Sequence, residues 1–159
     1  MTATILERRR IEAEFALKLM TVMTDRIGEE AAREILSVAV KDAARAFGRE
    51  LAAQEDGEPT LETFAERLSM WQADDALRLE VLEATPKKLS FNVHRCRYAE
   101  TYKEIGADGI GDILSCERDG EFCVGYNPRM KLTRTQTKMK GADYCDFRYT
   151  MDDAEDGPQ

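Results

Sequence analysis

The sequence predicts an α+β fold in which N-terminal helices pack with a four-stranded antiparallel sheet. Apolar residues recur at helical spacing through the first half of the chain, whereas beyond about Asp75 they alternate with polar residues, as in half-buried strands. The chain has 159 residues, 43% of them hydrophobic, which is enough for one domain with a single core. We therefore expect one domain over residues 1–150, with a helical part (1–74) and a sheet part (75–150), followed by a disordered acidic tail (151–159).

Three helices are predicted in the first half. Thr4 is a suitable N-cap for a helix that extends to about Thr24, and Gly28 interrupts its apolar pattern. A second helix is expected over residues 29–53, where many alanines allow a neighbouring helix to approach closely. After the polar linker QEDGEPT, Thr60 can cap a third helix. None of these segments contains a recognisable catalytic motif, so this half is expected to be scaffold or oligomer interface.

The second half predicts two pairs of strands with helices between them. ALRLEVLE and KLSFNVH alternate apolar and polar residues on either side of a turn at TPKK. The remaining elements are a short helix ending at Gly106, a longer helix over residues 109–128, and two strands over residues 130–139 and 144–151. A hairpin near Gly141 should join the last two strands.

The composition excludes several classes of protein. The formal net charge is −8 and no dense basic patch is present, so the chain is a poor candidate for binding nucleic acid. No run of about 18 apolar residues occurs, so no transmembrane helix is expected. The start MTATILERRR is charged too early for a signal peptide, and its three arginines are typical of a solvated helix face.

The cysteines are expected to be reduced thiols. Four cysteines in a chain without an export signal indicate the cytoplasm rather than a disulfide framework. Their spacing contains no C-x-x-C pair, and His94 is the single histidine. We therefore expect neither a zinc knuckle nor another cofactor.

The last two expected strands contain the first candidate site. Arg134 continues the apolar row of its strand, and Cys145 shares a face with apolar residues of the next. Pairing about a turn at residues 140–141 sets Arg134 against a residue near Phe147, with Cys145 as its diagonal neighbour. A guanidinium can hold a carboxylate through two hydrogen bonds, and it lowers the pKa of a nearby thiol. The alternative is an inert buried cysteine and an Arg134 that pairs with Asp146.

A second candidate lies on the long helix expected between the strand pairs. Cys116, Asp119 and Cys123 are spaced i, i+3 and i+7, so one helix face carries two thiols and a carboxylate. We expect Cys116 and Asp119 to face one pocket, where the carboxylate acts as a general base or holds a water for attack. The alternative is that both cysteines pack as small apolar residues while Asp119 lies at a rim.

His94 lies at the end of the second expected strand, with Cys96 just beyond it. The alternation places His94 on the polar face of the sheet. There it is either a surface histidine or, if that face lines a cleft, a proton shuttle near neutral pH.

The residues between Asn92 and Tyr149 resemble one family. The pieces that carry the resemblance are Cys96-Arg-Tyr-Ala-Glu100, Cys116-x-x-Asp119, Asn127-Pro128, Arg134-Thr135-x-Thr137, Gly141 and Cys145-Asp-Phe147. In order and spacing they are similar to the L-2-amino-thiazoline-4-carboxylic acid hydrolase family. The resemblance implies a hydrolase-like domain that opens a small heterocyclic ring at a C–N bond. Water adds to C2 of a thiazoline carboxylate and the ring opens to an N-carbamoyl cysteine; a lactam or imide is a related substrate.

Together, the patterns and the resemblance define the expected site. The catalytic candidates are Cys116, Asp119, Cys145 and His94, and the substrate-binding candidates are Arg134, Thr135, Asn127 and Cys96. Hydrolysis of an amidine carbon needs a nucleophile, a base and an anchor for the carboxylate, and thiol, carboxylate and guanidinium groups can supply these roles.

Two rival interpretations remain open. The chain could be a non-enzymatic module that binds a small ligand, or a soft metal through Cys96, Cys116, Cys145 and His94. It could also be an interaction protein whose N-terminal helices bind a partner. In every case these helices carry more apolar surface than a small sheet can cover, so we expect a homo-oligomer.

Overall fold

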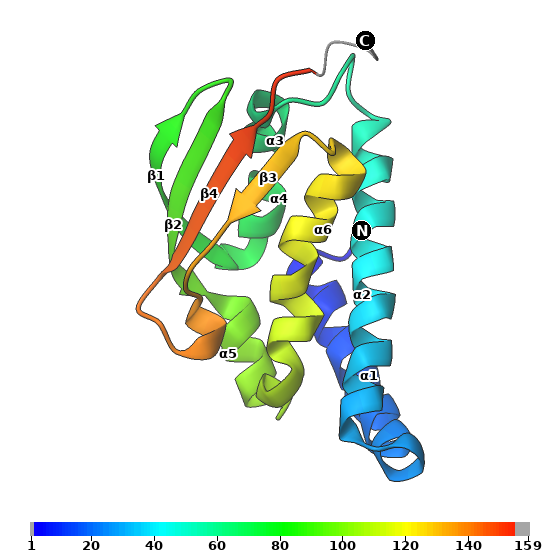
Figure 1. Cartoon of the computed structure of the whole chain (residues 1–159). Helices are drawn as coiled ribbons and strands as arrows, with labels where there is room; N and C mark the ends of the chain where they lie inside the picture. Colours follow the sequence, from blue (N-terminus) through cyan, green and yellow to red (C-terminus); the bar gives the residue numbers. More distant parts are fainter. Residues whose placement is uncertain (1, 155–159) are drawn as a thin grey trace.

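The computed structural model describes residues 2–154, and its helices cover one face of a four-stranded antiparallel sheet, as the sequence predicts (Figure 1). The helices are α1 (Ile5–Ile27), α2 (Glu29–Ala52), α3 (Leu61–Arg67), α4 (Ser69–Gln72), α5 (Arg97–Glu104) and α6 (Glu117–Tyr126). The strands are β1 (Leu77–Ala84), β2 (Lys88–Cys96), β3 (Met130–Thr133) and β4 (Cys145–Met151). Short 3-10 turns lie at Ala73–Asp75, Asp108–Ile110 and Lys138–Lys140, and a π-helical turn spans Asp112–Cys116.

Local signals in the sequence set the ends of the N-terminal helices. Thr4 caps α1 through a reciprocal pair of hydrogen bonds with Glu7, and Thr60 caps α3 in the same way with Thr63. Gly28 separates α1 from α2 with a φ of 88°, a backbone conformation that favours glycine. The three predicted helices are therefore confirmed, with a break after Arg67 that divides the third.

The sheet has the strand order β1-β2-β4-β3, and every neighbouring pair is antiparallel. Phe91 of β2 lies directly opposite Phe147 of β4, and their rings stack at a centroid distance of 4.9 Å. Alternate residues of these two strands are buried against the helices, whereas the residues between them face outward. The predicted alternation is confirmed on both central strands.

The third strand is shorter than predicted. It ends at Thr133, and Arg134 leaves the sheet at the point where it would have faced Phe147. The carboxylate of Asp146 accepts hydrogen bonds from the backbone amides of Thr135 and Gln136, both at 2.9 Å, and so takes the donors that a strand ladder would use. The two strands pair antiparallel in the predicted register, with Thr133 opposite Arg148, but the predicted short connection is wrong: a loop with a 3-10 turn joins β3 to β4.

The predicted domain end at residue 150 falls inside β4. Met151 pairs with Met130, and the backbone amide of Asp152 donates to the carbonyl of Arg129 at 2.9 Å. Asp153 forms an ion pair with Lys87. The rest of the expected acidic tail, residues 155–159, lies outside the described residues.

Helix α6 packs against α2 with almost no space between the two backbones. A Cβ atom on Gly125 would lie 2.8 Å from the carbonyl carbon of Arg45 and closer still to its oxygen. One on Gly48 would lie 2.8 Å from the amide nitrogen of Tyr126. Both glycines are therefore required for this approach, which holds α6 between α2 and the sheet (Figure 1).

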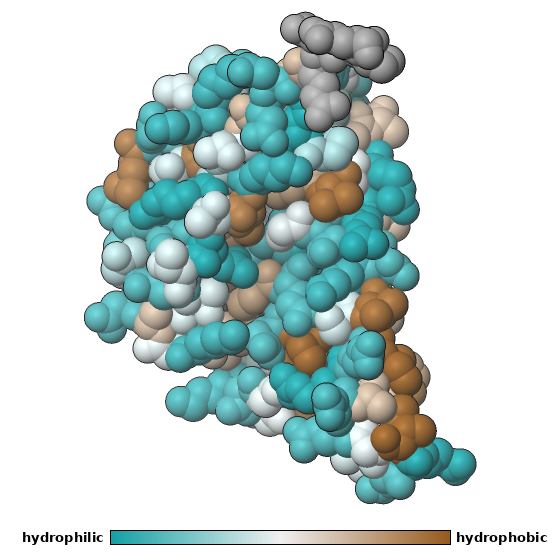
Figure 2. All heavy atoms as spheres, viewed as in Figure 1, coloured by the Kyte–Doolittle hydropathy of each residue, from teal (hydrophilic) through white to brown (hydrophobic). Residues whose placement is uncertain are grey.

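The outer surface of the α1–α2 hairpin is apolar. Its large exposed hydrophobic residues are Ile11, Phe15, Leu19, Val22 and Ile27 on α1, and Ile35 and Val38 on α2. Figure 2 shows hydrophobic residues gathered along this edge of the molecule. None of the helices in residues 2–154 has both the length and the hydrophobicity that crossing a membrane requires.

Substitution of Gly125 tests the α2–α6 contact. We expect Gly125→Ala to lower the free energy of unfolding by about 1–3 kcal/mol, because the added methyl meets backbone atoms that cannot rotate away. Gly120→Ala in the same helix is the matched control, since a Cβ there meets nothing within 4 Å. It should raise stability by about 0.5–1 kcal/mol. Urea denaturation of both variants measures the difference, and equal stabilities would contradict the packing argument.

The apolar edge of the α1–α2 hairpin predicts a homo-oligomer. Light scattering at micromolar concentration should give a mass above that of one chain. Phe15→Glu, at a side chain that is 63% exposed, should reduce that mass to the monomer value. Val81→Glu, at a similarly exposed position on β1, should leave the mass unchanged. A monomeric wild-type chain would exclude the prediction.

Candidate functional site

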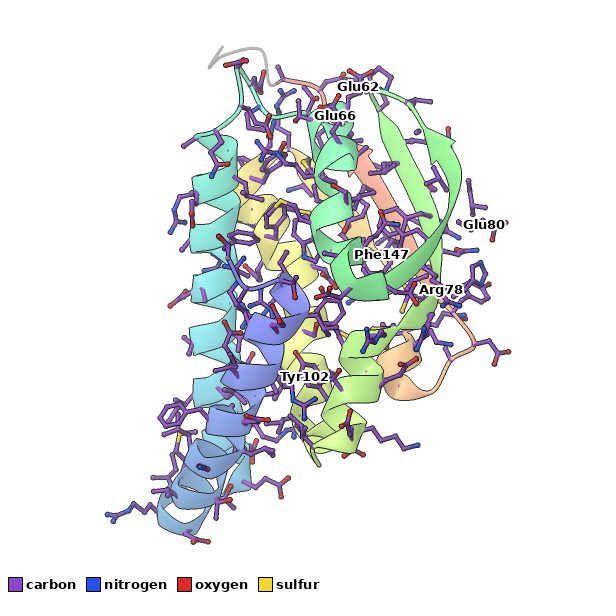
Figure 3. The ribbon with its side chains drawn as sticks, turned by 180° about the vertical axis from the view of Figure 1, so that it is seen from behind. Glu62, Glu66, Arg78, Glu80, Tyr102 and Phe147 are labelled. Carbon is purple, nitrogen blue, oxygen red and sulfur yellow. The ribbon has the colours of Figure 1, made fainter. Side chains whose placement is uncertain are left out.

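A cavity of about 90 Å³ lies between the buried face of the sheet and the helices. Its apolar wall combines aliphatic side chains with the aromatic residues Phe47, Phe64, Trp71, Phe91, Tyr98, Phe122, Phe147 and Tyr149. Figure 3 shows Phe147 on the side of the sheet that meets the helices. Because one water occupies roughly 10–15 Å³ on this measure, the cavity has room for a ligand of several non-hydrogen atoms. Small rings fit both its size and its wall.

Polar side chains gather at one end of this cavity. The predicted site residues Cys96, Cys116, Asp119, Arg134 and Cys145 all line it. Cys116 and Asp119 thus face one pocket, as their spacing predicts. The polar end is formed by Cys96 at the end of β2, Cys116 and Asp119 where the π turn meets α6, Arg134 just after β3, and Cys145 at the start of β4.

An ion pair between Arg134 and Asp119 dominates the polar end. Nη1 of Arg134 donates to Oδ2 of Asp119 at 2.6 Å, and Nη2 donates to the carbonyl of Cys116 at 3.0 Å. The guanidinium also lies over the ring of Phe147, 4.8 Å from its centroid. Arg134 therefore pairs with Asp119, whereas the alternative partner, Asp146, binds the backbone of the β3–β4 loop.

Burial and charge have opposite effects on this pair. Burial raises the pKa of Asp119 above its ordinary value, although the charge and hydrogen bonds of Arg134 oppose that rise. Burial lowers the pKa of Arg134, but the Asp119 carboxylate more than offsets this, so its pKa is raised. Oδ1 of Asp119 accepts no hydrogen bond from any residue between 2 and 154. That oxygen is free to hold a water or a ligand group.

The three cavity thiols are protonated at neutral pH. Burial raises the pKa of Cys96 to about 11 and that of Cys116 further, with the Asp119 carboxylate adding to the rise at Cys116. Burial also raises the pKa of Cys145. Cys145 combines two features that favour a thiolate: its sulfur accepts a hydrogen bond from the amide of Lys138 at 3.2 Å, and the charge of Arg134 lowers its pKa. Cys96 has only amide contacts, chiefly from Ala99, and Cys116 has only the charge of Arg134. Of the three, Cys145 has the surroundings best suited to a reactive thiol.

The π-helical turn Asp112–Cys116 turns Ser115 and Cys116 toward the cavity. Such turns interrupt regular helices and occur often at functional sites. The predicted helix over residues 109–128 is thus a compound element, which begins as 3-10 and π turns and continues as α6. Cys123, expected on the same face, packs instead in the core with the sheet and donates to the carbonyl of Asp119 at 3.4 Å.

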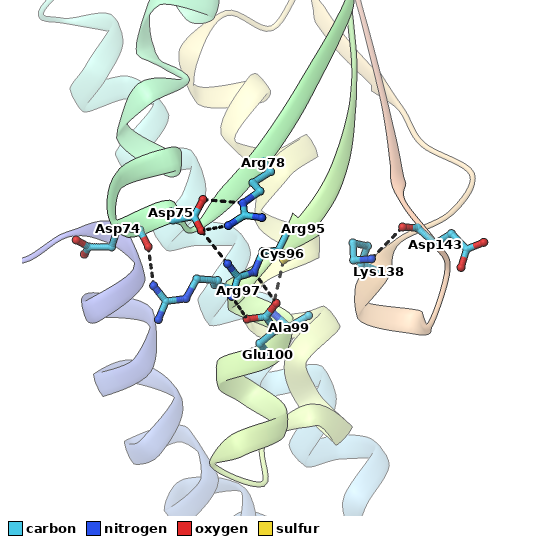
Figure 4. A network of polar contacts seen from close by, with 10 residues as sticks. All are labelled: Asp74, Asp75, Arg78, Arg95, Cys96, Arg97, Ala99, Glu100, Lys138 and Asp143. Carbon is cyan, nitrogen blue, oxygen red and sulfur yellow. Dashed lines mark hydrogen bonds and ion pairs between the residues drawn. The ribbon is translucent and has the colours of Figure 1, made fainter.

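A charged network outside the cavity supports the position of Cys96 (Figure 4). Asp75 accepts hydrogen bonds from Arg78 and Arg95, and Arg95 also donates to Glu100 on α5. Cys96 is the N-cap of α5, and its sulfur accepts the amide of Ala99 at 3.5 Å. Asp75 has a φ of 54°, a rare conformation for a residue other than glycine, which the two arginine contacts help to hold.

Three predicted site residues lie away from the cavity. His94 is exposed on the outer face of the sheet and contacts Glu80 at 2.7 Å, and Figure 3 shows Glu80 projecting away from the helices. Thr135 donates its hydroxyl to Asp146 at 2.5 Å in the loop after β3. Asn127 is buried, but its amide donates to the carbonyl of Pro59 and its oxygen accepts the amide of Arg129. In each case these contacts stabilise a turn or the surface of the sheet, and none of them involves the cavity.

The sequence reading missed two cavity residues, Arg9 and Arg118. Both line the polar end, and each side chain is only 13% exposed. The solvated face expected for Arg8–Arg10 is therefore wrong at Arg9. Helical spacing indicates the burial of Arg9. It lies four residues after Ile5 and four before Ala13, both buried, and so on the same face of α1.

The metal-binding alternative is not supported by the geometry. Within the part of the chain that the structure describes, no three His, Cys, Asp or Glu side chains are grouped as a metal site requires. His94, which that alternative places beside the thiols, lies on the opposite face of the sheet.

Solved structures with a similar fold include two proteins that are distant in sequence. The phenol-responsive sensory domain of the transcription activator PoxR, solved with phenol, has a TM-score of 0.56 and 10% identity, and the match covers 94% of this chain and 77% of that one. A trafficking protein particle complex subunit 3 from Naegleria fowleri, covalently bound to palmitic acid, has a TM-score of 0.53 and 12% identity, with 92% and 96% covered. At these identities the likeness shows the fold alone.

Sequence comparison is more specific. None of the curated proteins matches this sequence. The model of one family matches residues 8–149, which extends the resemblance from the second half of the chain through all of α2 and most of α1. The chain therefore belongs to the L-2-amino-thiazoline-4-carboxylic acid hydrolase family.

Proposed function

We propose that the chain is a hydrolase that opens a small heterocyclic ring at its amidine or amide carbon, with the ring held in the aromatic cavity. The family name denotes a hydrolase of this kind. The observation that carries the proposal is Asp119, which lines a ring-sized, largely apolar cavity while its Oδ2 is held by Arg134 and its Oδ1 accepts no hydrogen bond from residues 2–154. A buried carboxylate oriented in this way can take a proton from an attacking water.

In this proposal Arg134 positions Asp119 rather than holding the substrate. Both terminal nitrogens of Arg134 already donate to protein oxygens, Oδ2 of Asp119 and the carbonyl of Cys116. These two contacts hold the guanidinium against Asp119 and the Cys116 carbonyl, and they leave only its remaining N–H groups for a ligand. The fixed guanidinium restrains the Asp119 carboxylate to one orientation, which is the geometric condition for general base catalysis.

The attacking group in the proposal is water. The raised pKa values of Cys96, Cys116 and Cys145 keep all three thiols protonated at neutral pH. A protonated thiol is a poor nucleophile. Asp119, whose pKa is also raised, is a stronger base than an ordinary aspartate and matches the task better.

Hydrolysis of a 2-amino-thiazoline carboxylate needs only water and proton transfers. Water adds its oxygen to C2, and its proton passes to Asp119 and then to the leaving atom of the ring. If the C2–N bond breaks, the ring nitrogen leaves as an amine and the product is S-carbamoyl cysteine. The N-carbamoyl cysteine that the resemblance implies requires the C2–S bond to break and releases a thiol. A thiol-specific reagent therefore distinguishes the two products.

A binding module without catalysis is the second candidate. The aromatic wall and the protonated thiols favour it, because such a cavity holds a small ring without reacting with it. The sensory domain of PoxR, a structure of similar fold, was solved with phenol. Calorimetric binding of 2-aminothiazoline-4-carboxylate with no product after prolonged incubation would favour this candidate over the hydrolase.

The base is tested by Asp119→Asn. We expect kcat/KM for 2-aminothiazoline-4-carboxylate to fall by roughly 10²–10⁴-fold, the usual contribution of a general base. In the wild type, kcat/KM should rise with pH as Asp119 loses its proton. Because burial raises this pKa, the midpoint should lie above about 3.9, the ordinary value for aspartate.

Asp112→Asn is the matched control, since Asp112 lies in the adjoining π turn and pairs with Arg33 outside the cavity. It should retain both the activity and the pH profile. Full turnover by Asp119→Asn would exclude Asp119 as the base.

The thiol route is tested by Cys145→Ser. If water attacks, this variant should keep kcat within about tenfold of the wild type, because only the shape and polarity of the wall change. Cys123→Ala is the control, because Cys123 is buried outside the cavity lining. Loss of turnover in Cys145→Ser, with Cys123→Ala active and both variants folded, would make Cys145 the nucleophile instead.

A further inference from the structure

Arg9 and Arg118 form a second cationic group at the polar end of the cavity, and the proposed reaction does not use it. Arg9 comes from α1 and Arg118 from α6, and both side chains line the cavity. Together with Arg134 they give its lining three guanidinium groups against one carboxylate, Asp119. A cavity with this balance of charge attracts an anion.

The donors of these two arginines are only partly used. Nη1 of Arg9 donates to both oxygens of Glu12, at 3.1 and 2.9 Å. Arg118 donates from Nε to the carbonyl of Leu114 at 2.7 Å and from Nη2 to Glu12 at 3.1 Å. Nε and Nη2 of Arg9 and Nη1 of Arg118 have no acceptor among residues 2–154. Guanidinium donors that line a cavity and have no protein acceptor favour a ligand that supplies oxygen atoms.

The negative charge of Glu12 neutralises only part of the positive charge of Arg9 and Arg118. One carboxylate serves two guanidiniums, and its side chain is 45% exposed. Burial, with the neighbouring charge of Arg9, lowers the pKa of Arg118 to about 10, so Arg118 stays charged at neutral pH. One positive charge of the two is left without a protein counter-ion.

A hydroxyl donor lies in the same part of the fold. Tyr102 of α5 is fully buried where α1, α5 and α6 come together (Figure 3), and its hydroxyl has no hydrogen-bond partner within the described residues. Burial raises the pKa of Tyr102 to about 12, although the charge of Arg9, the nearby Ser115 hydroxyl and the charge of Arg118 oppose that rise, so the hydroxyl keeps its proton. This region is therefore rich in donors and poor in acceptors.

We propose that Arg9 and Arg118 bind the carboxylate of a small ring acid, and so determine that the chain selects anionic over neutral rings. The inference rests on the proposed function for the identity of the ring, but not for the binding of the anion. The ligand would lie with its ring against the aromatic wall and its carboxylate between α1 and α6. Arg134 and Asp119 would then remain free of the substrate carboxylate, as the proposed base requires.

Binding measurements on the full chain test this inference without relying on turnover. Two probe pairs are used in calorimetry: 2-aminothiazoline-4-carboxylate against 2-aminothiazoline, and benzoate against benzamide. The wild type should bind the acid of at least one pair more tightly than its neutral partner. Arg9→Gln and Arg118→Gln should weaken binding of that acid by roughly tenfold to a hundredfold, the scale of a lost charged hydrogen bond, and leave the neutral ring unaffected.

Two further variants make the result independent of any loss of folding. Arg8→Gln is the matched control, because Arg8 is exposed on the same turn of α1 and should bind like the wild type. Glu12→Gln removes the competing carboxylate at a half-exposed position, so it should tighten binding of the acid several-fold. A merely structural role for Arg9 and Arg118 predicts no such tightening.

The outcomes separate this inference from the proposed function. Ring opening with an unchanged KM in both arginine variants would overturn the inference and leave the hydrolase intact. Suppose that benzoate binds in a way that depends on the two arginines, and that 2-aminothiazoline-4-carboxylate is not opened. This result would support the inference and count against the hydrolase. A wild type that binds neither acid more tightly than its neutral partner would overturn the inference outright.

Discussion

The backbone contact between α2 and α6 is the constraint on which the cavity depends. Gly48 and Gly125 let the two helices approach without side chains between them, so α6 lies against α2 on one side and above the sheet on the other. A wider separation would push α6 toward the sheet or tilt it. In either case Phe122 and Asp119, both on α6, would no longer face the cavity in their present positions.

The fixed position of α6 also explains why a buried ion pair is tolerated. Asp119 and Arg134 come from elements that are not neighbours in the chain, α6 and the loop after β3. Removing two charges from water is costly, and their attraction offsets that cost only when the geometry is held closely. Here the contact with the Cys116 carbonyl and the stacking on Phe147 complete the surroundings of Arg134. The pair leaves Asp119 with one oxygen that accepts no hydrogen bond from residues 2–154, at the polar end of the cavity.

The cavity therefore has two chemically different ends, which suits a ring acid. Its aromatic wall provides area for a flat ring, and its polar end provides positive charge and one oriented carboxylate. The thiols lie at the polar end but stay protonated, because burial disfavours a thiolate. The apolar wall that would suit a ring thus makes the cysteines weaker nucleophiles than their number suggests.

Local chemistry in the sequence determined much of the fold and part of the site. Thr4, Gly28 and Thr60 mark helix ends through caps and backbone conformation, and alternation marks β2 and β4, because each of these signals acts between residues close in the chain. The spacing of Cys116 and Asp119 likewise predicts that they share a pocket.

Only the tertiary structure decided which partners these groups have. The sequence leaves Arg134 with two possible acids, and the packing of α6 selects Asp119, while Asp146 ends β3 by binding the loop backbone. Arg9 lies within a run of arginines that is typical of a solvated face, and it is buried because α1 packs where α6 presents Arg118. The physical reason is the same in each case. A side chain's burial, charge partner and pKa depend on elements far away in the sequence, which local periodicity does not encode.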